Sequence, residues 1–308
     1  MLAVPYSRYV FGTLPWYSVL IVSGICAALI LAFREEKRLG LPKDTTVDLA
    51  LWVIPFGIIG ARLYYVVFQW DLFRNNPIEI FKIWQGGLAI YGGVIGGLIG
   101  AAVYSRMRRI PFSRLTDLAA PGLPLAQAIG RWGNYFNMEA YGAPIINPAW
   151  QFFPAGVLIK GSWYMATFFY ESMWNLTVFI LLMLTRRRMR RPGDAFLWYA
   201  MLYGAGRFVI EGFRTDSLML GRLRVSQLLS LGLCVAVFLI FSLRAIHSGQ
   251  GHTPIAAIVI AAVLTLGPVA ALMLSGTGSA VLTLLPSLVL PLCALYTYRM
   301  TSSAATEV

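Results

Sequence analysis

The sequence predicts an all-α integral membrane protein, built as a polytopic bundle of transmembrane helices. Three observations predict this class. Of the 308 residues, 58% are hydrophobic, only 12% are charged, and the apolar residues gather in runs long enough to cross a bilayer. A soluble domain carries about 25% charged residues, so this chain has too little polar surface to cover a globule of its size. Lipid is therefore the predicted solvent.

Seven apolar runs form the predicted core, because a spanning helix needs about 20 apolar residues. The six continuous runs cover residues 15–33, 48–70, 86–105, 163–184, 195–213 and 225–243. The seventh, residues 115–135, contains Pro121 and Pro124, and membrane helices tolerate such breaks where the backbone is buried in protein. Two further runs, 254–275 and 279–298, predict a C-terminal two-helix hairpin that faces lipid, since it has almost no polar side chains.

The predicted domains follow from these runs. Residues 1–245 form the membrane domain, and residues 246–308 carry the hairpin, to which the sequence assigns no role. The first residues lack the order of a signal peptide, so the first run is expected to stay as a helix. The segment 136–162 is the longest predicted outside loop and suits a cap over an outward-facing site.

The net charge of +12 comes largely from basic clusters that lie between apolar runs. They are Arg34, Lys37 and Arg38; Arg106, Arg108 and Arg109; and Arg186, Arg187, Arg188, Arg190 and Arg191. This distribution is the positive-inside pattern of membrane proteins and argues against a nucleic-acid partner. It places the N-terminus outside and the C-terminus inside.

Cysteine and histidine usage argues against metal and redox chemistry. Cys26, Cys234 and Cys293 each lie within an apolar run, where they are expected to be small buried hydrophobes, and no CxxC pair occurs. His247 and His252 both follow the run 225–243, on the predicted inner side. We therefore expect no metal and no cofactor.

The strongest polar motif is the segment GRWGNYFNMEAYG, residues 130–142. Arg131 and Asn134 are three apart, on one face of a helix, and Asn137 and Glu139 follow at the predicted outer boundary. Ionisable residues inside spans are costly and therefore mark functional sites. The planar guanidinium of arginine suits phosphate, so this segment predicts an anion-binding pocket.

A second motif lies on the predicted span 195–213, where Tyr203, Arg207 and Glu211 follow each other at a spacing of four. One interpretation is an Arg207–Glu211 pair that only holds the bundle together. The other is an anionic ligand shared with Arg131.

The third motif is glycine-rich, GGLAIYGGVIGG from Gly86 to Gly97. Small residues of this kind let membrane helices pack closely, and they also clear space around the hydroxyl of Tyr91. The segment lacks the lysine and Ser/Thr of a phosphate loop. Arg62 and Glu171 are charged within predicted spans, so each is expected to have a partner.

These motifs resemble those of the prolipoprotein diacylglyceryl transferase family. Its signature has Gly-Arg, Gly-Asn, a later Asn, Glu and Gly at the spacings of residues 130–142, with Phe usual where this chain has Tyr135. Trp16-Tyr17, the glycine-rich segment, GRFVIEGFRTD and SQLLS resemble further family segments in the expected order. The resemblance covers residues 10–245, so the hairpin lies outside it.

The resemblance implies a seven-helix enzyme of the bacterial cytoplasmic (inner) membrane, with its N-terminus outside. Such enzymes transfer diacylglyceryl from phosphatidylglycerol to the lipobox cysteine of a preprolipoprotein signal peptide and release glycerol phosphate. The family's essential arginines match Arg131 and Arg207. Its other matching residues are Tyr17, Asn134, Asn137, Glu139, Gly142 and Glu211. Some members have His in the glycine-rich segment, where this chain has Tyr91.

Expected roles follow from this comparison and from chemistry. Arg131 and Arg207 would stabilise the departing phosphate, Glu139 or Glu211 would accept the thiol proton, and Tyr91 would donate a hydrogen bond or relay the proton. The residues expected to contact substrate are Tyr17, Arg62, Asn134, Asn137, Gly142 and Tyr203.

Three other functions stand beside this one. A transporter or channel for a lipid or small anion would use the same arginines, although the sequence shows no internal repeat. A related phospholipid transferase would act on a sugar or amine. A silent relative would have lost activity along with the histidine.

Overall fold

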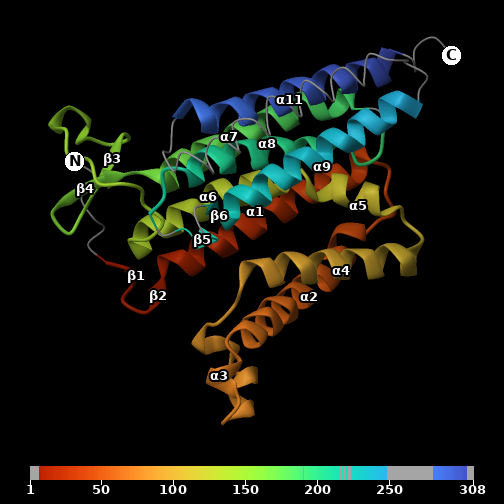
Figure 1. Ribbon diagram of the computed structural model, residues 1–308. Helices are drawn as coiled ribbons and strands as arrows, with labels where there is room; N and C mark the ends of the chain where they lie inside the picture. Colours follow the sequence, from red (N-terminus) through yellow and green to blue (C-terminus); the bar gives the residue numbers. More distant parts are fainter. Residues whose placement is uncertain are drawn as a thin grey trace. The chain divides into compact units, whose positions relative to one another are not determined.

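The computed structural model describes residues 7–189, 191–215, 217, 219–220, 223–247 and 280–303. They fold mostly as helices, drawn in Figure 1. The chain divides into two units, Met1–Ala28 with Ala120–Val308 and Leu29–Ala119, and each is described by itself. The first unit is called the site unit here and the second the glycine-helix unit.

The α-helices have the bounds α1 Trp16–Arg38, α2 Thr45–Phe68, α3 Trp70–Phe73, α4 Ile90–Arg108, α5 Phe112–Ala119, α6 Gly122–Asn137, α7 Thr167–Thr185, α8 Asp194–Glu211, α9 Val225–His247 and α11 Ala280–Ser303. The short 3₁₀ helices are η1 Pro77–Phe81, η2 Ile83–Gln85, η3 Pro148–Trp150 and η4 Arg186–Arg188. The strands are β1 Tyr9–Val10, β2 Leu14–Pro15, β3 Gly156–Ile159, β4 Ser162–Met165, β5 Met219–Leu220 and β6 Leu223–Arg224.

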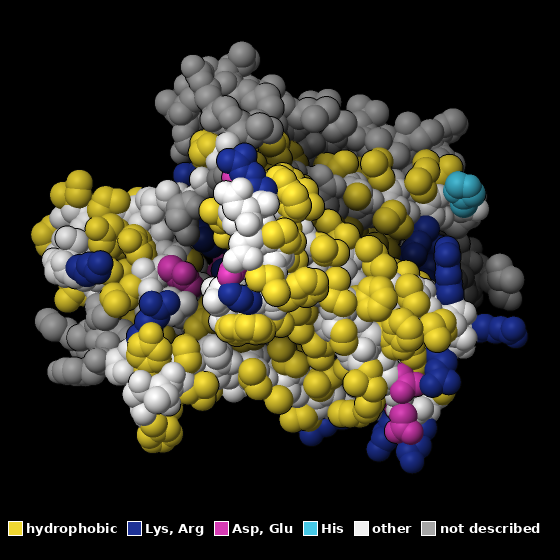
Figure 2. Space-filling view, turned by 90° about the horizontal axis from the view of Figure 1, so that it is seen from below, with side chains coloured by type: hydrophobic (Ala, Val, Ile, Leu, Met, Phe, Trp, Pro, Cys, Tyr) yellow, Lys and Arg dark blue, Asp and Glu magenta, His cyan; other side chains and the backbone are white. Residues whose placement is uncertain are grey.

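Several of these helices suit a membrane. Among the described residues, four are long and apolar enough to cross it: Trp16–Arg38, Thr45–Phe68, Thr167–Arg188 and Val225–His247. Their apolar side chains are largely exposed, as for Leu51 and Leu63, and Figure 2 shows hydrophobic side chains over much of the visible surface. Exposed apolar surface of this extent needs lipid as its solvent, so this is a helical, multi-pass membrane protein.

In the glycine-helix unit, α2 and α4 pack through glycines. Gly92, Gly96 and Gly100 are spaced by four and line one face of α4, where all three are buried. A Cβ at Gly100 would lie 2.8 Å from the Trp52 carbonyl oxygen, and one at Gly60 would lie 2.9 Å from the Cα of Gly96. The packing interpretation of these glycines is therefore confirmed, since any side chain would separate the two backbones.

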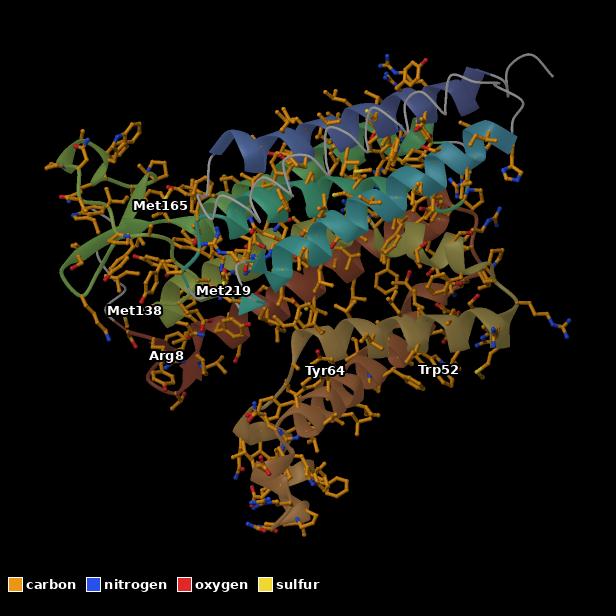
Figure 3. The ribbon with its side chains drawn as sticks, viewed as in Figure 1. Arg8, Trp52, Tyr64, Met138, Met165 and Met219 are labelled. Atoms are coloured by element: carbon orange, nitrogen blue, oxygen red, sulfur yellow. The ribbon has the colours of Figure 1, made fainter. Side chains whose placement is uncertain are left out.

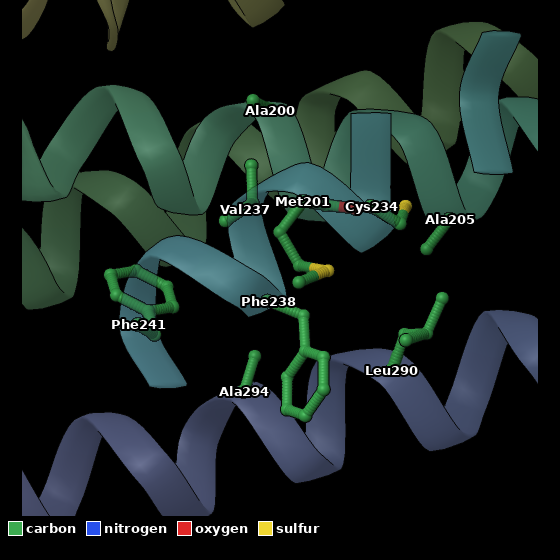
Figure 4. Close-up of a cluster of buried hydrophobic side chains, with 9 residues drawn as sticks. All are labelled: Ala200, Met201, Ala205, Cys234, Val237, Phe238, Phe241, Leu290 and Ala294. Atoms are coloured by element: carbon green, nitrogen blue, oxygen red, sulfur yellow. Dashed lines mark hydrogen bonds between the residues drawn. The ribbon is translucent and has the colours of Figure 1, made fainter. Parts of the chain in front are cut away.

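In the site unit, α7 packs against α6 and α8, and α8 in turn packs against α9. Helix α11 packs on α8 and α9. Figure 4 shows the apolar cluster where these last three helices meet, with Met201 from α8, Cys234 and Phe238 from α9, and Leu290 from α11.

The expectation of buried cysteines is right for Cys234 and wrong for Cys26, which is exposed on α1. Because α1 is one of the apolar spanning helices, a small apolar side chain is tolerated on its surface.

The structure differs from the sequence prediction in two places. The predicted single span 115–135 is two helices, α5 and α6, because Pro121 has no N–H with which to continue α5. Three two-stranded antiparallel hairpins, β1–β2, β3–β4 and β5–β6, were not predicted. The β3–β4 hairpin turns at Lys160 and Gly161, both at positive φ, which suits a tight hairpin turn.

The helix count of seven plus two stays a prediction. The first run of the predicted hairpin, 254–275, lies outside the described residues, and the second run corresponds to α11. The predicted boundary at residue 245 also stays a prediction.

Candidate functional site

The site unit brings together residues that lie far apart in the sequence. Arg131 from α6 and Arg207 from α8 contact the same carboxylate, that of Glu171 on α7. The distances are 2.5 Å from Arg131 Nη2 to Glu171 Oε1 and 2.7 Å from Arg207 Nη1 to Glu171 Oε2. Arg207 Nη2 also lies 2.7 Å from Glu211 Oε2. These four residues are called the charge cluster below.

The charge cluster is buried unevenly. The side chains of Glu171 and Glu211 are 3% exposed, whereas Arg207 is 14% and Arg131 23% exposed. Two buried carboxylates are tolerated because each contacts a guanidinium group. Arg214 also lies here, with Nε 3.9 Å from Glu211 Oε2. Two arginines that contact one carboxylate, one of them partly exposed, suit an anionic ligand.

Glu171 is the residue that the sequence prediction underrated. Its charge inside an apolar run predicted a partner, and the structure supplies two arginines instead of one. The predicted Arg207–Glu211 pair is present, but it is not self-contained, because Arg207 also contacts Glu171. The cluster therefore orients both arginines and does more than join adjacent turns of one helix.

A second polar group lies where α6 ends, and Figure 3 labels two of its neighbours, Arg8 and Met138. Asn134 and Asn137 donate from Nδ2 to Glu139 Oε1, at 3.0 and 3.1 Å. Arg8 Nε donates to Asn137 Oδ1 at 3.0 Å. Three residues predicted from the signature thus form one hydrogen-bonded group, and Glu139 in it is exposed.

The backbone explains how Glu139 reaches these amides. Met138 and Ala140 both have positive φ, of 56° and 55°, in the left-handed region that is rare for residues other than glycine. The first of them ends α6 and turns the chain back, so that Glu139 N donates to the Asn134 carbonyl at 3.0 Å. Strained backbone of this kind tends to occur at functional sites.

Two glycines of the signature are explained by close packing. Gly142 N donates to the Met165 carbonyl at 2.8 Å, and a Cβ at Gly142 would lie 2.7 Å from the Phe213 carbonyl oxygen. Gly133 lies against the ring of Tyr17, where a Cβ would be 2.8 Å from Cδ2. Any role of Gly142 or Tyr17 in binding substrate stays a prediction.

Further polar side chains lie on the same helices, beyond the charge cluster. Tyr203, one turn before Arg207, stacks on Tyr199 with ring centroids 5.8 Å apart. The hydroxyl of Tyr199 accepts from Gln127 Nε2 at 2.9 Å. Asn175, one turn after Glu171, is fully buried, and within the described part of the chain neither of its side-chain polar atoms has a hydrogen-bond partner. The role of Tyr203 in binding substrate stays a prediction.

Arg62 and Tyr91 belong to the glycine-helix unit. Arg62 is buried and donates to four backbone carbonyls, those of Glu79, Ile80, Gly86 and Gly87. The expected partner of Arg62 is therefore the backbone between α3 and α4. Tyr91 is the second residue of α4, is 41% exposed, and has its ring centroid 6.4 Å from that of Tyr64. Their predicted roles stay predictions.

Within the described ranges, no three His, Cys, Asp or Glu side chains gather in a group that could hold a metal ion. The charge cluster instead combines carboxylates with guanidinium groups. Arginine does not deprotonate in proteins, so the cluster is suited to hold an anion and to stabilise developing negative charge.

Comparison with known proteins identifies the family of this chain. The family model described as prolipoprotein diacylglyceryl transferase matches residues 8–243. Proteins named phosphatidylglycerol–prolipoprotein diacylglyceryl transferase are similar over most of their length. The Listeria welshimeri protein is 49% identical over 226 residues, which cover 71% of this chain and 82% of that protein. The Limosilactobacillus reuteri protein is 48% identical over 241 residues, which cover 75% of this chain and 87% of that protein. The Bacillus cytotoxicus protein is 45% identical over 241 residues, which cover 76% of this chain and 89% of that protein.

The matched range contains the charge cluster, the end of α6 and the glycine-rich helix α4, and it ends before α11. The chain therefore belongs to the prolipoprotein diacylglyceryl transferase family.

Proposed function

We propose that this protein transfers the diacylglyceryl group of phosphatidylglycerol to the lipobox cysteine thiol of a preprolipoprotein and releases glycerol phosphate. Membership of the family and the names of its relatives support this reaction. The observation that carries the residue assignment is the contact of Arg131 and Arg207 with one buried carboxylate. We place the protein in the bacterial inner membrane with its N-terminus outside and its C-terminus inside, on the basis of the arginine clusters.

In the proposed reaction, the thiolate sulfur of the substrate attacks the glyceryl carbon that carries the phosphate. A carbon–sulfur bond forms, the carbon–oxygen bond breaks, and the electron pair leaves on the phosphate oxygen. Negative charge therefore grows on the leaving group. Arg131 and Arg207 stabilise this charge more in the transition state than in the ground state, which is the condition for a faster chemical step.

The thiol must also lose its proton. A free cysteine has a pKa near 8.5, so a few per cent is thiolate at neutral pH without assistance. Glu211 and Glu171 are buried and paired with guanidinium groups, whereas Glu139 is exposed and, among the described residues, its carboxylate accepts from two neutral amides. We therefore assign proton acceptance to Glu139, directly or through water. The expected role of Tyr91 as a hydrogen-bond donor or relay comes from the family resemblance and stays a prediction.

A small cavity lies beside this carboxylate. It has a volume of about 10 Å³ and is lined in part by Asn134, Tyr135, Glu139 and Phe168. That volume is about what a single water needs. A cavity of this size, lined by carboxamide and carboxylate groups, suits the water-mediated form of proton transfer.

The test is transfer of labelled diacylglyceryl from phosphatidylglycerol vesicles to a lipobox peptide by the purified protein. We expect transfer that needs the peptide cysteine and falls by at least about 10²-fold in Arg131→Ala, the usual loss for one stabilising donor. Arg108→Gln is the matched control, because Arg108 is 60% exposed and pairs with Asp48 in the other unit.

Each alternative function predicts a different result. Transfer to a sugar or amine with none to the peptide would show a different acceptor. Folded protein that binds phosphatidylglycerol but transfers nothing would favour the transporter or the silent relative, and a flux assay in vesicles would separate these two.

A further inference from the structure

Helix α11 lies beyond the residues that the family model matches, yet it is anchored on the site unit. Asp194, at the start of α8, is 1% exposed and contacts both α9 and α11. Its Oδ1 lies 2.7 Å from Arg244 Nη1, and its Oδ2 accepts from the Tyr298 hydroxyl at 3.0 Å. One buried carboxylate therefore joins three helices at this end of the unit.

A groove lies beside this anchor, lined by residues of the end of α7, of η4, of α8 and of α11. Its volume is about 790 Å³, within the range of sites that take small molecules or lipid chains. The apolar part is formed mainly by leucines, and the polar part by guanidinium groups. The leucines are Leu181, Leu182, Leu202 and Leu295, and the arginines are Arg187, Arg188 and Arg299.

The groove is remote from the charge cluster. Glu171 lies near the first turn of α7 and Thr185 ends that helix, so the two are about 21 Å apart along the axis at 1.5 Å per residue. The argument for the groove therefore does not depend on the proposed reaction.

The chemistry of the groove points to one kind of occupant. Among the described residues that line it there are three arginines and no aspartate or glutamate, so an anion is favoured. The adjoining leucines belong to helices of a membrane protein, where acyl chains are the available apolar ligand. Basic residues at the end of a spanning helix attract anionic lipid headgroups. A free phosphate would use the arginines and leave the exposed Leu181 and Leu295 uncovered.

We propose that this groove binds an anionic phospholipid, with its phosphate held by Arg187, Arg188 and Arg299 and an acyl chain lying on the leucines. Under the proposed topology the lipid belongs to the cytoplasmic leaflet. Leu295 and Arg299 come from α11, so the C-terminal extension completes the site. Its role would be to hold a structural lipid against α7 and α8.

The test uses the full-length protein in phosphatidylcholine vesicles that contain a photoactivatable lipid with a diazirine in its acyl chain. One probe is phosphatidic acid and the other is phosphatidylcholine. Mass spectrometry then maps the labelled peptides. We expect phosphatidic acid to label the peptides of Leu181 and Leu295 more than phosphatidylcholine does, and both probes to label the exposed side of α1 equally.

The variant for this experiment is Arg187→Gln/Arg188→Gln/Arg299→Gln. Each arginine removed is expected to lower labelling of the groove by phosphatidic acid about five-fold. A matched control, Arg106→Gln/Arg108→Gln/Arg109→Gln, removes the same charge from the other unit, where all three side chains are exposed, and should leave labelling unchanged. Thermal unfolding of both variants shows that each is folded.

Three results would overturn the proposal. Equal labelling by the two probes would reduce the groove to ordinary lipid-facing surface. Unchanged labelling in the arginine variant would show that these arginines do not hold the headgroup. Absence of label from the groove peptides, with label elsewhere, would mean that the chain's own segment 248–279 or another protein occupies it.

Discussion

Replacing Glu171 with Gln removes a negative charge that contacts both Arg131 and Arg207 while keeping nearly the same side-chain volume. The carboxylate is 3% exposed, so the two guanidinium groups lose a partner that water cannot replace fully. Breaking a buried ion pair in this way costs about 3–5 kcal/mol. Arg207 keeps its contact with Glu211, and Arg131 is partly exposed. We therefore expect the free energy of unfolding to fall by about 3 kcal/mol, the lower end of that range.

The same change should affect catalysis. Glu171 holds the two guanidinium groups within a few ångströms of each other. Without it they repel, and the phosphate meets two arginines that are less well oriented. A misplacement of about 1 Å costs about 10²-fold in rate, so we expect kcat to fall by about that factor and KM to change less.

Two assays test this prediction, chemical unfolding in detergent and transfer to a lipobox peptide. The matched control is Glu79→Gln, a partly exposed carboxylate of the other unit that pairs with Lys82. A double-mutant cycle of Glu171→Gln with Arg131→Gln should show a coupling of about 0.5–3 kcal/mol. If Glu171→Gln unfolds and turns over like the unmodified protein, the charge cluster does not orient the arginines.

Three further predictions concern single residues. Asn175→Val should raise the free energy of unfolding by about 1 kcal/mol, because it removes buried polar atoms that lack a partner among the described residues. If chemical unfolding shows a lower free energy of unfolding for this variant, the amide is satisfied. Gly142→Ala should destabilise by at least about 1 kcal/mol, because its Cβ would lie 2.7 Å from a backbone oxygen. Gly232→Ala, with nothing within 4 Å, should instead be neutral or stabilising by the same unfolding assay. Glu139→Gln should lower kcat by about 10²–10⁴-fold with unfolding unchanged. Full turnover in Glu139→Gln/Glu211→Gln would exclude both of these carboxylates as the base.

Much of this protein follows from its sequence. Low charge and long apolar runs predict lipid as the solvent, because the chain cannot cover a soluble globule. Helical spacing places Arg207 and Glu211 on one face, and the structure confirms their ion pair. The signature at residues 130–142 indicates the family, and the family model confirms it.

The tertiary structure decided which polar groups meet. Spacing along one helix shows the face on which a charge lies, but the partner across the interface depends on how helices pack. The sequence therefore predicted only that Glu171 needed a partner. The packing of α7 between α6 and α8 supplied two arginines. Arg62 shows the same limit, since its buried guanidinium is satisfied by backbone carbonyls, which every residue carries and no sequence motif marks.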